Sequence, residues 1–205
     1  EVGLIVKHDG SAWRDELNRD WSTMVRFSLP DYDGFAINAT AADPTQSAAY
    51  AGVGTVLYGM AVNPSNNKLY VTNTDANNAV RFEGSRPPGN TISSVQGHLH
   101  EARITIIDPS NGSVAPRHLN KHIDYAVTPA AAGVKDKSLA IPQGLAVTAD
   151  GNTIYVAAKG SSKIGVFSKL SLENNTFVPD SSAHITVPGG GPTGLLLDGP
   201  RPRLY

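Results

Sequence analysis

The chain of 205 residues has a net charge of −1 and no cysteine. The balanced charge excludes a general electrostatic attraction for nucleic acid or anionic membranes, and the missing thiols exclude disulfides, thiolate metal sites and thiol nucleophiles. Apolar residues make up 40% of the chain, but no apolar run approaches the roughly 20 residues of a membrane helix, and the 20 glycines and 14 prolines indicate a turn-rich, all-β globular fold.

The first part of the chain, residues 1–50, contains short apolar segments separated by polar ones. Apolar and polar residues alternate in Met24–Leu29, as in a half-buried strand. The other expected elements are a strand at 2–7, a helical turn at 15–19, an outer strand at 35–39 and a small-residue linker over 41–51.

The second part, residues 51–135, contains the strongest strand pattern of the chain, Arg103–Asp108, which is followed by a turn at Pro109–Gly112. Two excursions rich in turn-forming or polar residues interrupt this part, at 83–96 and 117–138. The remaining expected strands are 56–62, 68–73, 79–82 and a return strand that starts at 113–116.

The stretch Gly144–Phe167 contains three short apolar runs, and β-branched and aromatic residues dominate the last two, which favours strands over helices. Asp150-Gly151 supplies the positive φ angles that a tight hairpin turn needs. We therefore expect an antiparallel meander of strands at 144–148, 153–157 and 164–167, with a fourth strand at 184–187. Gly189–Gly191 then lets the chain turn into another inner strand.

A pattern of glycine, apolar triplet, polar turn and a tyrosine eleven positions after the glycine occurs three times. The pairs are Gly59/Tyr70, Gly144/Tyr155 and Gly194/Tyr205. The copies begin 85 and then 50 residues apart, so the repeat measures about 45–50 residues, with a long insertion in one copy. A four-stranded unit with that period is typical of a β-propeller blade.

The segment Leu69–Asn73 reads LYVTN, and Ile154–Ala158 is a looser copy of it. The chain thereby resembles the YVTN-repeat β-propellers, a WD40-like family. The stretches GHLHEARITIID and RHLNKHID are similar to those of large bacterial extracytoplasmic YVTN proteins, some of which carry a cytochrome c segment. The resemblance implies a periplasmic or extracellular protein of a bacterium or archaeon. Any haem would be bound outside this chain, which has no CxxCH.

The repeat predicts one partial β-propeller of about three four-stranded blades with long loop excursions. Its parts are the end of one blade (1–50), a blade with insertions (51–135), a blade (136–190) and the start of the next (191–205). Closed propellers have about four to eight blades, and unpaired sheet edges invite aggregation. We expect the missing blades to come from the rest of the polypeptide or from a protein partner.

Four of the six histidines lie in two short segments that flank the Arg103–Asp108 strand, so they can meet in space. Neutral imidazoles suit Zn, Cu, Fe or Ni, and a carboxylate can complete the shell. The candidate metal ligands are His98, His100, His118, His122 and Glu101, with Asp124 as an alternative carboxylate. Two other interpretations stay open: histidines that hold the excursions through backbone hydrogen bonds, which is the favoured one, and a docking surface near a haem.

A second candidate cation site is oxygen-rich, because Asp75 has Asn77 and Asn78 beside it, as in a Ca²⁺ site at a blade rim. Turn and capping roles are the favoured interpretation there, and no segment matches an EF-hand. Neither a P-loop nor a GxSxG nucleophile motif is present.

The leading functional hypothesis is a non-catalytic, extracytoplasmic scaffold that docks a partner or a fused redox domain through the excursions at 84–101 and 117–138. A part of a metal- or haem-dependent oxidoreductase is the alternative. A component of a surface layer or filament is the second alternative. No catalytic residue is predicted, because propellers serve enzymes and binding platforms alike.

Overall fold

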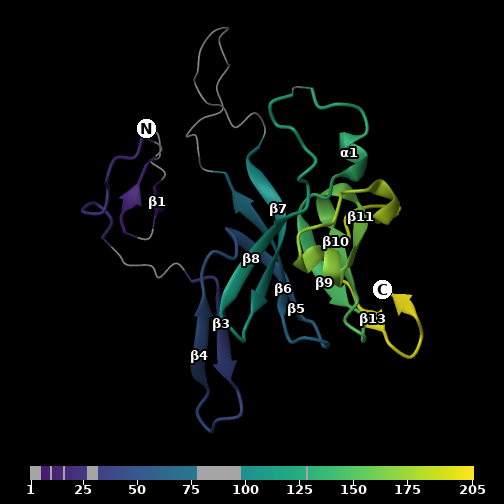
Figure 1. The fold of residues 1–205 in the computed structure, drawn as a ribbon, viewed down its shortest axis with the longest axis horizontal. Coiled ribbons are helices and arrows are strands. Elements are labelled where there is room, and N and C mark those ends of the chain that lie inside the picture. Colours follow the sequence, from purple (N-terminus) through teal and green to yellow (C-terminus); the bar gives the residue numbers. More distant parts are fainter. Residues whose placement is uncertain (1–5, 10, 16, 27–31, 78–97, 128) are drawn as a thin grey trace.

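A computed structural model describes residues 6–205 except for 10, 16, 27–31, 78–97 and 128. Two four-stranded antiparallel sheets stand side by side, with smaller hairpins beside them (Figure 1). The elements are β1 (Lys7–His8), β2 (Trp13–Arg14), β3 (Gly34–Asn38), β4 (Thr45–Tyr50), β5 (Val56–Val62), β6 (Leu69–Ala76), β7 (His100–Asp108), β8 (Ser113–His118), α1 (Val134–Lys137), β9 (Pro142–Val147), β10 (Thr153–Ala158), β11 (Lys163–Ser168), α2 (Lys169–Glu173), β12 (His184–Thr186), β13 (Leu197–Asp198) and β14 (Arg203–Leu204).

The two large sheets are meanders in which each strand pairs with its neighbours in sequence. Their orders are β5-β6-β7-β8 and β9-β10-β11-β12, and β3-β4 and β13-β14 form separate two-stranded sheets. The all-β, four-stranded antiparallel pattern expected from the repeat is therefore observed. No helix among the described residues is long and apolar enough to cross a membrane.

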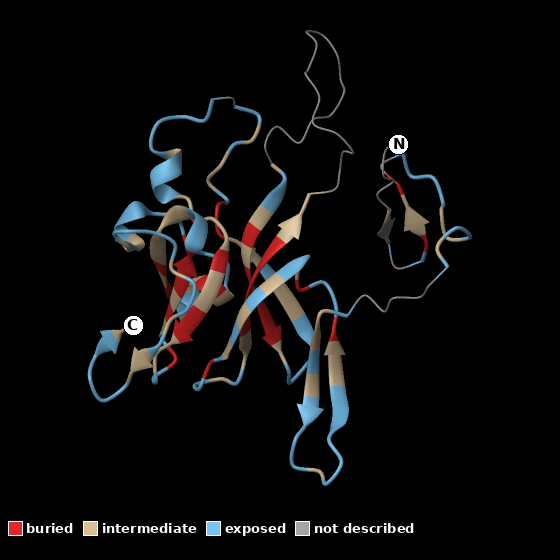
Figure 2. Ribbon diagram, turned by 180° about the vertical axis from the view of Figure 1, so that it is seen from behind, coloured by how far each residue is buried: buried red, intermediate tan, exposed pale blue. Residues whose placement is uncertain are grey.

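The β5–β8 sheet is apolar on both faces, as expected of a blade that lies between others. On one face, Tyr70 and Ile104 belong to a buried cluster with Ile154 and Val156 of the β9–β12 sheet. On the opposite face, Val71 belongs to a second cluster, against which small residues of the β3–β4 hairpin pack. Buried residues accordingly concentrate on the central strands (Figure 2). Each fully buried large side chain contributes about 1.5–3 kcal/mol.

The repeated glycines mark the points where the inner strands of successive blades touch through their backbones. These inner strands are β5 with Gly59, β9 with Gly144 and the segment with Gly194 that leads to β13. A Cβ on Gly59 would lie 2.8 Å from the carbonyl oxygen of Gln143 and 3.3 Å from Cα of Gly144. A Cβ on Gly144 would lie 2.7 Å from the carbonyl oxygen of Thr193 and 2.9 Å from Cα of Gly194. Each repeat glycine therefore faces the next one, which explains why the pattern recurs.

Thr72 links the same two inner strands by hydrogen bonds. Its hydroxyl accepts from the backbone N–H of Gly59 at 2.9 Å and donates to the carbonyl oxygen of Gln143. Farther along, the backbone N–H of Gly144 donates to the carbonyl oxygen of Thr193 at 2.8 Å. The close approach of the glycines is thus accompanied by polar contacts that buried backbone groups require.

The tyrosine of the first repeat copy joins the two sheets at the far end of the inner strands. Tyr70 is fully buried, and its hydroxyl donates to Oε1 of Glu173 at 2.5 Å. Asn63 donates to the Tyr70 hydroxyl at 3.0 Å and to the carbonyl oxygen of Gly151 at 2.9 Å. Burial, followed by the hydrogen bond to Glu173, raises the pKa of Tyr70. Tyr205, its counterpart in the third copy, is exposed.

The short helix α2 contacts residues of the β5–β8 sheet and its β5–β6 connection through an ion pair and through hydrogen bonds to its backbone carbonyl groups. Lys68 donates to Oε2 of Glu173 at 3.1 Å, and Arg117 of β8 donates to the carbonyl oxygens of Leu172, at 2.9 Å, and Glu173. Cations at a helix C-terminus complement its partial negative charge. Because α2 directly follows β11, these contacts stabilise the packing of the β9–β12 sheet against the β5–β8 sheet.

Two expectations for the first fifty residues are wrong. The segment 41–51, expected to be a linker, contains β4, which pairs with β3. Small residues suit this strand because Ala48 packs closely against the second buried cluster. The turn expected at 15–19 is not helical in the residues described there, because the Asp15 carboxylate accepts the backbone N–H groups of Leu17 and Arg19 and holds a loop.

Other expected strands fall partly or wholly on residues that the structure does not describe. Residues 24–26 of the expected strand 24–29 are not in a strand, and 27–29 lie outside the described residues. The expected strand 79–82 and residues 2–5 of the first strand also lie outside them. The other expected strands are observed with bounds that differ by a few residues: 35–39, 56–62, 68–73, 103–108, 113–116, 144–148, 153–157, 164–167 and 184–187.

We predict that Gly144→Ala destabilises the protein by about 1–3 kcal/mol, because backbone atoms crowd the added methyl group and cannot turn away as a side chain would. Gly194→Ala is the matched control, since a Cβ there meets nothing within 4 Å, and its free energy of unfolding should stay within about 1 kcal/mol of wild type. Urea unfolding followed by circular dichroism measures both. Equal effects of the two substitutions would refute the proposed contact.

We predict that Glu173 makes stability depend on pH below neutrality. Burial alone raises its pKa, but the hydrogen bonds from Tyr70, Asn66 and Lys68 outweigh burial and hold the pKa below its usual value. A carboxylate with a depressed pKa contributes stability above its unfolded pKa of about 4.3 and loses it as the pH falls through the lower folded pKa.

Glu173→Gln should therefore lower the free energy of unfolding at pH 7 by about 1–3 kcal/mol. It should also flatten the decline of stability between about pH 5 and pH 3. Urea titrations across this range test the prediction. An unchanged acid slope would show that the contacts of Glu173 do not carry it.

Candidate functional site

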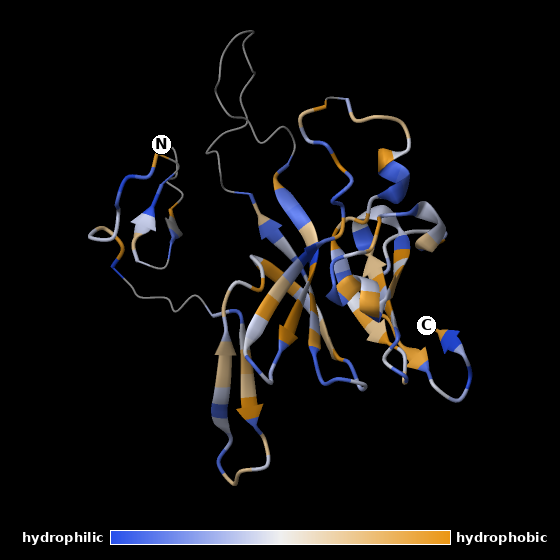
Figure 3. Ribbon diagram, viewed as in Figure 1, coloured by the Kyte–Doolittle hydropathy of each residue, from blue (hydrophilic) through white to orange (hydrophobic). Residues whose placement is uncertain are grey.

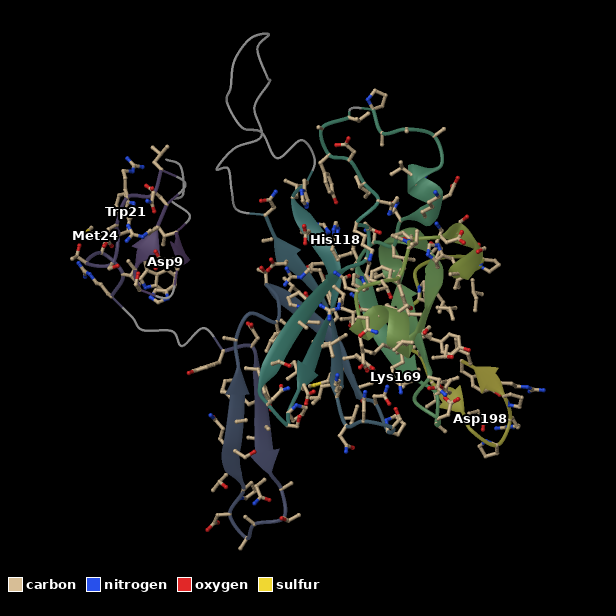
Figure 4. The ribbon with its side chains drawn as sticks, viewed as in Figure 1. Asp9, Trp21, Met24, His118, Lys169 and Asp198 are labelled. Carbon is tan, nitrogen blue, oxygen red and sulfur yellow. The ribbon has the colours of Figure 1, made fainter. Side chains whose placement is uncertain are left out.

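The paired ends of β7 and β8 bring three of the predicted site residues together. Arg103 of β7 lies opposite His118 of β8, and β7 continues beyond this pair to His100. His118 therefore sits at the rim of the blade, below the segment that leads to α1 (Figure 4). His98 and Glu101 reach the same place from the beginning of β7.

Glu101 lies between the two imidazoles. Its Oε1 is 3.4 Å from Nε2 of His98 and 3.9 Å from Nδ1 of His118. The two imidazole rings are nearly parallel, 14° apart, with centroids 6.3 Å from each other. Both histidine side chains are 20% exposed, so the cluster is partly withdrawn from solvent.

Tyr125 completes the cluster, and sequence reasoning did not identify it. Its ring stacks on that of His98 with centroids 3.6 Å apart and an interplanar angle of 4°. The contact joins the beginning of β7 to the segment 119–133. The only available signal was an aromatic residue three positions after His122, which does not by itself indicate a partner.

The other two predicted ligands lie elsewhere. His100 is exposed on β7 opposite Ala76, and adjacent strand residues point to opposite faces, so it faces away from Glu101. His122 donates from Nε2 to the carbonyl oxygen of Val134 at 3.0 Å and thereby holds α1. His98 precedes β7 and His100 is its first residue, so the two predicted ligands do not lie side by side on one strand.

The cluster favours a neutral His118. Burial lowers the pKa of His118, and the positive charges of Arg103 and of protonated His98 and His122 lower it further, while Glu101 acts in the opposite direction. Arg103 itself is held by Asp75, at 2.8 Å.

The predicted oxygen-rich site around Asp75 has other partners for its carboxylate. Oδ2 of Asp75 accepts from Arg103, and Oδ1 accepts from the hydroxyl of Thr55 at 3.1 Å. Asn77 donates to the backbone carbonyl oxygen of His98 at 2.9 Å, and Asn78 lies outside the described residues. In this structure Asp75 fixes Arg103 at the rim.

The chemistry of the cluster is that of weak bases beside one carboxylate. Among the described residues, the Nε2 atoms of His98 and His118 are buried and make no hydrogen bond, although Nε2 of His98 lies 3.4 Å from Oε1 of Glu101. Across the described residues, no group of three or more His, Asp or Glu side chains is arranged to hold a metal ion. Metal binding by the predicted ligands therefore stays a prediction.

Two apolar residues close to the cluster in the chain are exposed. Leu99, which follows His98, is 59% exposed, and Val127, two positions after Tyr125, is 49% exposed. Apolar residues occur not only on the strands but also in the segment before α1 (Figure 3). We call the surface of His98, Leu99, Glu101, His118, Tyr125 and Val127 the histidine rim.

Comparison with known proteins supports the fold and adds nothing on the site. No protein-family model and no curated protein matches the chain, so the resemblance to YVTN repeats stays a prediction. A solved chain of hydrazine synthase from Kuenenia stuttgartiensis, a protein that contains β-propellers, matches with a TM-score of 0.50 and 15% identity. The match covers 78% of this chain and 43% of that one. Together with the four-stranded meanders, it confirms the all-β β-propeller fold.

We predict that His98→Ala loosens the segment 119–127, because it removes the stack on Tyr125. Such a stack contributes about 0.5–1.5 kcal/mol, so amide hydrogen exchange in that segment should accelerate by about a factor of 2 to 10. The matched control is His100→Ala, since His100 is exposed and faces the other way. If both variants exchange alike in this segment, the stack does not hold it.

Proposed function

We propose that this chain is part of an extracytoplasmic β-propeller scaffold that binds a protein partner at the histidine rim. One observation carries the proposal: two segments distant in the sequence are joined by the stack of His98 on Tyr125 and leave Leu99 and Val127 exposed beside it. The extracytoplasmic location rests on the resemblance to YVTN proteins.

The rim has the features of a protein-binding surface. The stacked rings of His98 and Tyr125 order the loop before any partner arrives, so binding costs less conformational entropy. Aromatic residues are enriched at interface centres, and here exposed apolar side chains extend that centre. The ionisable side chains of Glu101 and His118 provide polar groups at the edge of this apolar centre.

The scaffold role is supported by surfaces that further blades of the same polypeptide or another chain would cover. Phe35 and Ile37 on β3 are more than half exposed, as are Met60 and Val62 on β5. Met60 and Val62 lie opposite Val71 and Leu69, which belong to or pack against a buried cluster.

The third repeat glycine differs from the other two. A Cβ on Gly194 would meet nothing within 4 Å, whereas a Cβ on Gly59 or Gly144 would contact backbone atoms of the next inner strand. The contact that joins the described blades can therefore be repeated there. This supports a propeller larger than the described part.

A photo-crosslinking residue at position 127 in the native host should capture a defined protein. The same residue at position 170 should not, because Leu170 is also apolar and exposed but lies on α2. Leu99→Asp should then weaken the captured complex by at least about tenfold, since it places a charge in an apolar contact. Capture at position 170 alone, or no effect of Leu99→Asp, would contradict docking at the rim.

A second candidate function is part of a metal- or haem-dependent oxidoreductase, favoured by the approach of one carboxylate oxygen to two imidazoles. It predicts that Zn²⁺ binds stoichiometrically to purified protein in isothermal titration calorimetry. Binding should be lost in His98→Ala and His118→Ala and kept in His100→Ala, whose side chain faces away. Absence of stoichiometric binding to the wild type would remove this candidate. The third hypothesis, a surface-layer or filament component, stays a prediction.

A further inference from the structure

The array of sheets in the described residues has half a blade on each side. In the complete sheets β5–β8 and β9–β12, the first strand carries the repeat glycine, the second carries the repeat tyrosine, and two more strands follow. The segment from Gly194 through β13 and β14 to Tyr205 has the first two of these strands, and no third strand among the described residues pairs with β14. It therefore forms the inner half of a blade.

The β3–β4 hairpin forms the outer half of another blade. β4 leads into β5 just as β12, the fourth strand of its sheet, leads into the segment of Gly194. The hairpin packs against a cluster that contains Val71, one position after the repeat tyrosine, and the counterpart Val156 is buried against the β5–β8 sheet. Within the described part of the chain, β3 has no neighbour on its other edge. Figure 1 shows the two half-blades on opposite sides of the large sheets.

One face of β5 is uncovered where the corresponding face of β9 is buried. Leu145, which follows the repeat glycine of β9, is 8% exposed and belongs to the cluster that β9 shares with the β5–β8 sheet. Met60 has the same position in β5 but is 62% exposed, and Val62 on the same face is 55% exposed. In the described structure, β5 therefore lacks the inner strand of a preceding blade.

The segment of Gly194 has the opposite face uncovered. Gly144 and Ala146 lie on the face of β9 that turns toward this segment, and Ala146 is 8% exposed. Their counterparts face outward: a Cβ on Gly194 would meet nothing within 4 Å, and Leu196 is 66% exposed. The surface that β5 needs and the surface that this segment offers are therefore the two sides of one repeated contact.

We propose that two copies of this chain pair head to tail and close a single propeller. The hairpin of Gly194–Tyr205 from each copy completes the blade that β3 and β4 form by half in the other copy. Gly194 then faces β5 of the second copy, beside Met60, as Gly144 faces the Gly194 segment within one chain, and the open edge of β14 meets that of β3. Two copies give four whole blades and two shared ones, which is within the about four to eight blades of closed propellers.

A third pair of apolar surfaces fits the same arrangement. Phe35 and Ile37 on β3 point away from the β5–β8 sheet, because Ala36 between them packs against the cluster there, and both are more than half exposed. In the closed pair they turn toward the β9–β12 sheet of the second copy, where Ile185 is 47% exposed and pairs with Ile164 on β11. Pairing removes this apolar surface from water, which favours association.

The occupant is a second copy because each of these open surfaces on one side of the array has its counterpart on the other side. The net charge of −1 leaves little repulsion between copies, and uncovered strand edges favour pairing with another chain. The histidine rim takes no part in these contacts. The inference therefore goes beyond the partner binding proposed above and does not depend on it.

Sedimentation equilibrium of the whole chain tests the proposal, which predicts a reversible species of two copies. Met60→Asp places a charge in the apolar contact, and Gly194→Leu places a side chain where β5 comes close, so each should weaken pairing by at least about tenfold. Both variants should keep the fold of the single chain, because Met60 is exposed and a Cβ on Gly194 has open space around it. Circular dichroism of dilute protein checks this.

The matched control is Leu99→Asp. It adds the same charge at an apolar residue of similar exposure, 59%, on the histidine rim, and it should leave pairing unchanged. Equal weakening by Leu99→Asp and Met60→Asp would contradict pairing through β5. Because the control changes the rim alone, failure of partner binding and failure of pairing are separate results.

A mixture of Met60→Asp and Gly194→Leu proteins distinguishes head-to-tail pairing from other modes. In a mixed pair, one junction joins an unaltered β5 face to an unaltered Gly194 segment, while the other junction carries both substitutions. The mixture should therefore form pairs at concentrations where neither variant does so alone, and no recovery on mixing would contradict the head-to-tail contact.

Two results for the wild type overturn the proposal. A single-chain mass at every concentration would assign the open faces to further blades of the polypeptide or to another protein. Growth beyond two copies, as a head-to-tail contact that does not close would give, would exclude the closed propeller.

Discussion

The backbone contact between successive inner strands is the constraint on which the rest of the structure depends. Gly59 faces Gly144, and Gly144 faces Gly194, at distances that a Cβ would close to less than 3 Å from a neighbouring carbonyl oxygen. Only glycine allows two strands to approach so closely near the axis. Because the contact fixes how far apart the blades stand, it also determines which side chains can fill the space between them.

The space between the blades is filled by apolar side chains and closed by a polar connection. Ile104 of β7 and Ile154 of β10 both belong to the buried cluster between the sheets, while the hydroxyl of Tyr70 donates to Glu173 of α2. A buried hydroxyl or carboxylate is stable only when it has a partner. The polar connection therefore specifies one relative position of the two sheets, which apolar packing alone would fix less sharply.

The rim inherits its geometry from this arrangement. The register of β7 and β8 places His118 beside Glu101 and His98, and the segment 119–133 folds back so that Tyr125 covers His98. The proposed partner-binding surface thus lies at strand ends and in connections carried by a sheet, which is the usual location of binding residues.

The sequence by itself determined the glycine–tyrosine repeat, the meander over 144–187 and most strands of the β5–β8 sheet, because glycine spacing and β-branched runs are local signals that the fold obeys. It placed the third strand of that sheet at 79–82, whereas β7 pairs directly with β6. It also indicated that His98 and His118 could meet. Only the tertiary structure decided that Tyr125 joins them, that His100 turns away, and that residues 45–50 form a strand. These depend on packing against residues far along the chain, and neither pairing partner nor burial is encoded in a local pattern.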